Sequence, residues 1–187
     1  MRRFLDLLYR AALILSALAI VAIALMVLTQ ITGRLTDRAA LALGLAPPGL
    51  RVPSIAEIGG FLFTGAVMLA LGPALKAGAH VRVTMLAGNL PPKAARALTL
   101  LVLIGAAALA IWAAWFSGLQ AWDSWEFNSV SYGIVKVPLW LPQGAMAFGL
   151  ALLAVALLDE AALEARGKLA GFRAHEQAER HNEEPTA

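Results

Sequence analysis

The stretch that decides the fold is AALILSALAIVAIALMVLT, residues 11–29, which carries no charged side chain. An α-helix needs about 20 apolar residues to cross the hydrocarbon core of a bilayer, so residues 11–30 predict a membrane-spanning helix. Arg2 and Arg3 precede this run, as in a secretory signal. The run is longer than the apolar region of about 7–15 residues in signal peptides, and no cleavage motif follows it. We therefore expect a retained helix rather than a cleaved signal.

Three further stretches have a similar length and few charges, at about residues 55–75, 97–120 and 138–158. They are continuously apolar, whereas the strands of a membrane β-barrel alternate between apolar and polar residues. Only 14% of the residues are charged, against about a quarter in soluble domains. The sequence predicts an all-α integral membrane protein with four transmembrane helices in one domain, residues 1–160, followed by a charged cytoplasmic tail, 161–187.

The distribution of basic residues predicts the orientation in the membrane, because lysine and arginine are more frequent in cytoplasmic loops. One side carries Arg2, Arg3, Arg10, Lys76, Arg82, Lys93, Arg96, Arg166, Lys168, Arg173 and Arg180. The other side has Arg34, Arg38, Arg51 and Lys136, out of 15 lysines and arginines in the chain. We therefore expect both termini in the cytoplasm and a multi-pass protein of the bacterial inner membrane, in contact with membrane lipids.

Two connections predict short interfacial helices. Residues 38–45 follow Thr36-Asp37 and end at Gly44, a usual stop signal. Residues 79–90 place Val81, Met85 and Leu86 on one side, which is typical of an amphipathic helix lying in the membrane interface. Pro91-Pro92 then ends this helix and begins the third span, since proline is tolerated in a first helical turn.

The residues that most chemistry requires are missing. The chain has no cysteine, so disulfides and thiolate metal sites are excluded. Its histidines, His80, His175 and His181, lie outside the spans, which leaves a helix-held haem unsupported. There is no P-loop, no catalytic triad pattern and no basic excess that suggests nucleic acid. We expect no enzyme activity and no cofactor, and the charge-free centres of the spans argue against proton or sodium transport by this chain alone.

Glu57, near the start of the second span, has two interpretations. Ser54 and Glu57 have the spacing of a capping box, in which each side chain bonds the backbone N–H of the other residue. Alternatively, Glu57 forms a buried hydrogen bond or ion pair with another subunit. A capping-only role predicts that Glu57→Gln leaves assembly with a partner intact.

Tryptophans and small residues mark the packing surfaces of the spans. All five tryptophans, Trp112, Trp115, Trp122, Trp125 and Trp140, lie between residues 112 and 140. They predict either an aromatic belt at the outer interface or a contact surface for an outer partner. Gly65, Ala66, Ala70 and Ala74 in the second span, and Gly144, Ala145 and Gly149 in the fourth, allow close helix approach.

Two motifs resemble a transporter family. Residues 71–83, LGPALKAGAHVRV, resemble the signature that follows the second span in the small membrane subunit of tripartite ATP-independent periplasmic (TRAP) transporters. Residues 137–143, VPLWLPQ, look like that family's start of the fourth span. Glu57 stands where the family often has an acidic residue. The resemblance covers roughly residues 10–160, although Thr84 stands where an acidic residue is common and the connection 33–54 is long.

The resemblance implies a three-part uptake system. A periplasmic solute-binding protein captures an organic acid, and a large TRAP membrane subunit carries it inward with sodium. The small subunit then pairs with the large one as a non-catalytic scaffold. On this resemblance Glu57, His80, Arg82 and Trp140 are candidates for structural or partner-interface residues. His80 and Arg82 either face solvent and lipid headgroups, or join the interfacial helix to the spans or to the large subunit.

Two other classes of function remain open from the sequence. A membrane-anchor subunit of a redox complex predicts bound haem or quinone and therefore a visible spectrum. A small self-sufficient carrier or channel predicts flux through this chain alone in liposomes.

Overall fold

The computed structural model describes residues 2–77 and 91–166. This part of the chain contains four helices: α1 (Arg2–Ala42), α2 (Ile55–Lys76), α4 (Pro92–Glu126) and α5 (Trp140–Ala165). All four are long and apolar enough to cross a membrane. Within the described residues, the prediction of an all-helical chain with four helices long and apolar enough to cross a membrane is confirmed.

The prediction of a separate interfacial helix at residues 38–45 is wrong. Helix α1 is continuous for 41 residues and ends at Ala42. Asp37 and Arg38 therefore belong to the spanning helix itself, and the chain leaves it near Gly44, where φ is +70°. Helix α4 begins at Pro92, as the sequence predicted. The second predicted interfacial helix, 79–90, and most of the tail lie outside the described residues. Of the tail, α5 includes the first residues as far as Ala165.

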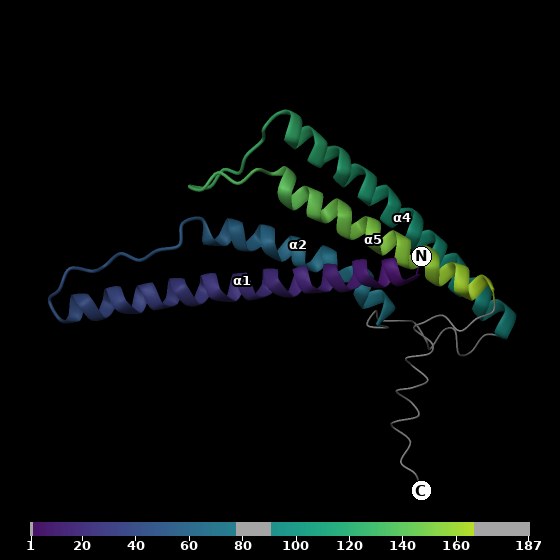
Figure 1. Cartoon of the computed structure of the whole chain (residues 1–187), viewed down its shortest axis with the longest axis horizontal. Helices are drawn as coiled ribbons and strands as arrows, with labels where there is room; N and C mark the ends of the chain where they lie inside the picture. The colour runs from purple at the N-terminus through teal and green to yellow at the C-terminus, as the bar shows by residue number, and fades with distance from the viewer. Residues whose placement is uncertain (1, 78–90, 167–187) are drawn as a thin grey trace, which may run out of the picture.

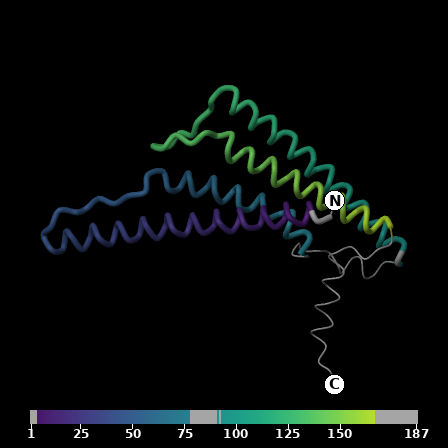
Figure 2. The backbone as a smooth tube through the Cα atoms, in the orientation of Figure 1, coloured from purple at the N-terminus to yellow at the C-terminus, as the bar shows by residue number. Residues whose placement is uncertain are grey.

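The helices form an open array rather than a closed bundle. Helix α1 packs on α2, α2 on α5, and α5 on α4, in that spatial order (Figure 1). The backbone trace in Figure 2 shows α1 reaching well beyond the start of α2, with the connecting segment returning alongside it. Broad apolar faces of α1 and α4 are exposed as a result, including Leu18, Leu25, Leu101 and Leu109.

Backbone contact between α2 and α5 sits at the centre of the array. A Cβ placed on Gly149 of α5 would overlap the backbone of Met68 in α2. Gly65 faces Ala145 at the same interface, and a Cβ there would lie 3.6 Å from that alanine's Cβ. Lipid gives no hydrophobic force between helices, so close packing of small residues is what holds them together.

The core around this contact consists mainly of alanine and leucine. Its buried members are Tyr9, Ala12, Leu75, Leu103, Ala107, Ala110, Leu152, Ala154, Ala156, Leu157 and Ala161. Helix α1 contributes only its first part to this core. Further along, the Ser16 hydroxyl donates a 2.8 Å hydrogen bond to the Ala66 carbonyl and fixes the register of α1 on α2.

We predict that Gly149→Ala destabilises the array, because the added methyl group forces α2 and α5 apart. Overpacking of this kind costs about 1–3 kcal/mol. Thermal unfolding of the detergent-solubilised chain measures the effect. The matched control is Gly144→Ala on the same helix, where an added Cβ meets nothing within 4 Å. Equal unfolding temperatures for the two variants would contradict the assigned contact.

Candidate functional site

Apart from the hydrogen bond between Ser16 and Ala66, the described polar contacts that connect the helices gather at the two ends of the array. We call the end with Asp6, Lys76, Arg96 and Asp159 the basal end. The end with Ser54, Glu57 and the connection between α4 and α5 is the hairpin end. The positions between the ends of each helix carry no ionisable residue over residues 11–33, 58–75, 97–122 and 137–158.

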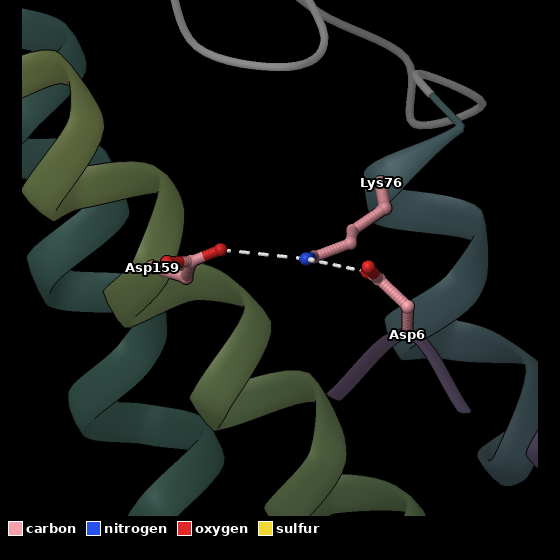
Figure 3. Close-up of polar contacts among 3 residues, drawn as sticks. All are labelled: Asp6, Lys76 and Asp159. Atoms are coloured by element: carbon pink, nitrogen blue, oxygen red, sulfur yellow. Dashed lines mark ion pairs between the residues drawn. The ribbon is translucent and has the colours of Figure 1, made fainter. Parts of the chain in front are cut away.

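Lys76 joins three helices at the basal end. Its ammonium lies 3.3 Å from the Asp159 carboxylate of α5 and 4.0 Å from the Asp6 carboxylate of α1. Figure 3 shows the lysine side chain reaching from the last turn of α2 into the space between these two acids. Lys76 and Asp159 are both about a quarter exposed, whereas Asp6 is more than half exposed. The pair with Asp159 is therefore the stronger, since water screens it less.

The ring of Tyr9 packs against the ammonium group of Lys76. The Lys76 ammonium lies 4.7 Å from the centre of the Tyr9 ring, a cation–π distance. Tyr9 is 5% exposed, and its hydroxyl has no hydrogen-bond partner within the described residues. Gly72 gives the ring its space, because a Cβ there would lie 3.3 Å from the Tyr9 Cε1 atom. One lysine thus fixes the start of α1 against both α2 and α5.

Arg96 connects α4 to the last turn of α5. Its guanidinium donates to the Glu164 carbonyl from Nε at 3.1 Å and from Nη2 at 2.7 Å, and Nη2 also donates to the Ala165 carbonyl at 2.9 Å. The last carbonyls of a helix have no partner within the helix and carry partial negative charge. Arg96 satisfies them and so holds the first turns of α4 on the end of α5.

We predict that Lys76 and Asp159 are energetically coupled. A double-mutant cycle with Lys76→Met and Asp159→Asn should give a coupling free energy of about 1 kcal/mol for this partly buried pair. The same cycle with Asp6→Asn serves as the control and should give a smaller value, because Asp6 is more distant and more exposed. Thermal unfolding in detergent measures both cycles. A larger coupling to Asp6 than to Asp159 would contradict this geometry.

Glu57 and Ser54 bind the hairpin at the other end. The Glu57 Oε1 atom accepts the Gly133 N–H at 3.2 Å, and the Ser54 hydroxyl accepts the Val135 N–H at 3.1 Å. Ser54 does precede α2, but it makes no side-chain capping bond and its φ is +53°. The predicted capping box is therefore wrong. Both side chains turn away from their own helix because a second backbone segment offers them its free N–H groups.

The hairpin that they bind spans residues 129–139. Ser131 N donates to the Val137 carbonyl at 2.9 Å and Leu139 N to the Ser129 carbonyl at 3.0 Å. The Ser131 hydroxyl accepts from Val137 N and donates to the Val135 carbonyl, which closes the tip. A Cβ on Gly133 would overlap the Glu57 carboxylate, so only glycine lets the two segments approach this closely. The hairpin directs the Tyr132 and Ile134 side chains outward, where they are 98% and 85% exposed.

We predict that Glu57→Ala releases the hairpin tip without unfolding the helices. Amide hydrogen exchange at Gly133 should accelerate about tenfold or more, because a hydrogen bond to a charged group contributes about 1.5–3 kcal/mol. Glu57→Gln keeps a carbonyl acceptor and should show a smaller increase. Glu126→Ala, an exposed glutamate at the same end, is the matched control. Unchanged hydrogen exchange at Gly133 in Glu57→Ala would show that Glu57 does not hold the hairpin tip.

Trp140 lies beside the hairpin, at the first position of α5. Its ring meets Trp125 of α4 edge-on, with 5.0 Å between the ring centres. These rings, Trp122 and the start of the hairpin line an open depression of about 510 Å³. Trp112, Trp115 and Trp122 are exposed on α4. The contact of Trp140 is thus with its own chain, and its role toward a partner stays a prediction.

The structure brings together only part of the predicted site. Glu57 and Trp140 lie at the hairpin end, while His80 and Arg82 lie outside the described residues. The sequence reasoning did not single out Lys76, Asp6, Asp159 or Arg96. A signal was present for the main pair, since Lys76 ends the second span and Asp159 ends the fourth, and two even-numbered spans end on the same side of a membrane.

An open array of four apolar helices, in which Lys76 and Arg96 connect neighbouring helices near their ends, defines a multi-pass helical membrane protein. A family model described as tripartite ATP-independent periplasmic transporters, DctQ component, matches residues 49–167. The chain belongs to this family, the small membrane component of TRAP transporters. The match includes both motifs, Glu57 and Trp140. No curated protein and no solved structure matches the chain.

Proposed function

We propose that this chain is the non-catalytic scaffold subunit of a TRAP transporter. It pairs with the large membrane subunit, which takes up an organic acid together with sodium after a periplasmic binding protein delivers it. In this proposal both termini face the cytoplasm of a bacterium and the hairpin end faces the periplasm. The family membership supports the assembly, and the excess of basic residues at the basal end supports the orientation.

The main observation in support of a scaffold role is the location of the charged groups. Ion paths and substrate sites in membrane proteins use polar or ionisable side chains deep in the spans. Here the charged contacts that join helices lie at the basal end, where Lys76 and Arg96 bind groups of this same chain. Ser16 contributes a polar bond between α1 and α2, and its hydroxyl is already bonded to Ala66. Such an array resists separation of its helices and offers no charged relay across the bilayer.

The exposed apolar faces of α1 and α4 support pairing with another membrane subunit. Each of these outer helices contacts a single neighbour closely, so most of its surface is free for lipid or for a partner helix. A partner subunit that binds these faces would be supported by helices that are themselves fixed across the membrane. His80 and Arg82, within the family signature, are proposed to contribute to pairing on the cytoplasmic side.

We predict that the tagged chain copurifies with the large membrane subunit when the two are produced together. Arg82→Ala should reduce the recovered partner severalfold, whereas Arg166→Ala, an exposed arginine outside the signature, should not. Quantitative gel analysis of the purified complex measures the ratio of the subunits. Undiminished pairing of Arg82→Ala would remove Arg82 from the interface, and absence of any pairing would overturn the scaffold role.

The same preparations separate the other classes of function. In liposomes, uptake should require the large subunit, the binding protein and a sodium gradient. Flux through this chain alone would instead identify a self-sufficient carrier. A visible absorption spectrum of the purified chain would identify a redox anchor.

A further inference from the structure

Three of the four basic residues at the hairpin side of the chain gather at one place. Arg34 and Arg38 lie one helical turn apart in α1, and Arg51 lies in the segment that returns from α1 to α2. Together with Gln30 and Asp37 they line an open pocket of about 410 Å³. Basic residues are sparse on the non-cytoplasmic side of membrane proteins, so their concentration in one pocket calls for a physical reason.

The returning segment is fixed on α1 by specific contacts. The Gln30 Oε1 atom accepts the Val52 N–H at 2.9 Å, and the Asp37 Oδ1 atom accepts the Gly49 N–H at 2.8 Å. Between these bonds, a Cβ on Gly33 would overlap the carbonyl of Leu50, so helix and segment touch through their backbones. The position of Arg51 relative to the two helical arginines is therefore built into the fold.

The pocket has an excess of positive charge. Three arginines and one aspartate line it, and one oxygen of Asp37 is already engaged by Gly49. Over residues 2–77 and 91–166, none of the three guanidiniums forms an ion pair or a hydrogen bond with a side chain or carbonyl. Like charges held this close favour a bound anion, and the planar guanidinium matches a phosphate group well.

The position of the pocket along the membrane normal indicates where the bound anion comes from. From Arg10 to Arg34 helix α1 rises about 36 Å at 1.5 Å per residue, against a hydrocarbon core of about 30 Å. A tilt of about 20° shortens this rise only slightly. Arg34 therefore emerges from the hydrocarbon at the level of the lipid headgroups, with Arg38 one turn further out. Leu35 and Leu50, both exposed beside the pocket, offer apolar contact to the adjoining lipid.

We propose that Arg34, Arg38 and Arg51 bind the phosphate headgroup of an anionic phospholipid in the leaflet at the hairpin end. Helix α1 carries two of the guanidiniums and the returning segment carries the third. The site rests on α1 crossing the bilayer and does not depend on the transporter role. Arg34 and Arg38 also lie outside the residues that match the family model.

Native mass spectrometry of the full chain tests this site with phosphatidylglycerol, phosphatidylcholine and inorganic phosphate as probes. The chain should retain one phosphatidylglycerol in preference to phosphatidylcholine. Each of Arg34→Gln, Arg38→Gln and Arg51→Gln should weaken this binding by about fivefold, the effect of one basic residue at an anionic membrane surface. The triple variant should abolish the preference.

The matched control removes the same charge at the basal end through Arg10→Gln, Lys93→Gln and Arg166→Gln. This control should keep the bound phosphatidylglycerol. Equal loss in both triple variants would overturn the proposal, since general attraction to basic residues would then explain the binding. Displacement of the lipid by millimolar inorganic phosphate would also overturn it, because the ligand would then be the free ion.

Two further measurements keep the test decisive. Arg51→Gln alone leaves α1 unchanged, so its weaker lipid retention supports the site even if the triple variant unfolds. The pocket variants are also tested for binding of the solute-binding protein. Normal lipid retention with lost binding of that protein would assign the arginines to a protein contact and overturn the lipid site.

Discussion

The structure depends on one contact, the approach of the α2 and α5 backbones at Gly149 and Met68. In a lipid environment, apolar side chains gain little by leaving lipid for one another, so helices stay together through close packing and a few polar bonds. The glycine removes the side chain that would separate the two backbones. Helix α4 then packs on the outer side of α5, and α1 packs on α2. Loss of this central contact would leave two helix pairs without a shared core.

Polar bonds at the two ends complement this apolar centre. At the basal end Lys76 and Arg96 bind groups on neighbouring helices, and at the hairpin end Glu57 and Ser54 bind backbone N–H groups. Charged groups at the helix ends have a small desolvation penalty, because headgroups and water solvate them. The same groups at the centre of the bilayer would be strongly unfavourable. The division between small residues inside and charges at the ends gives the array a fixed geometry and leaves its outer faces apolar. That combination suits a subunit that supports another.

Sequence patterns predicted the helices well because each charge-free run has the length that a bilayer requires. They underestimated α1, because the predicted span ended near residue 30, before Arg34, Asp37 and Arg38. These residues are compatible with a helix, however, and the chain turns only at Gly44. The spacing of Ser54 and Glu57 correctly predicted the start of α2, but it did not predict the hydrogen-bond partners of these two side chains. Those partners lie in the hairpin, far away in the sequence, where no local pattern could indicate them.

The length of α1 has a mechanical consequence. The bond from Ser16 to Ala66 sets an antiparallel register that places the start of α2 close to Val27. Beyond that level, α1 continues to Ala42 and is bonded by the returning segment. Helix α1 is thus packed on α2 as far as about Val27, while its remaining third is held by the returning segment alone among the described residues. Because the part beyond Val27 is roughly 22 Å long, a rotation of about 5° at the level of Val27 moves its end by about 2 Å.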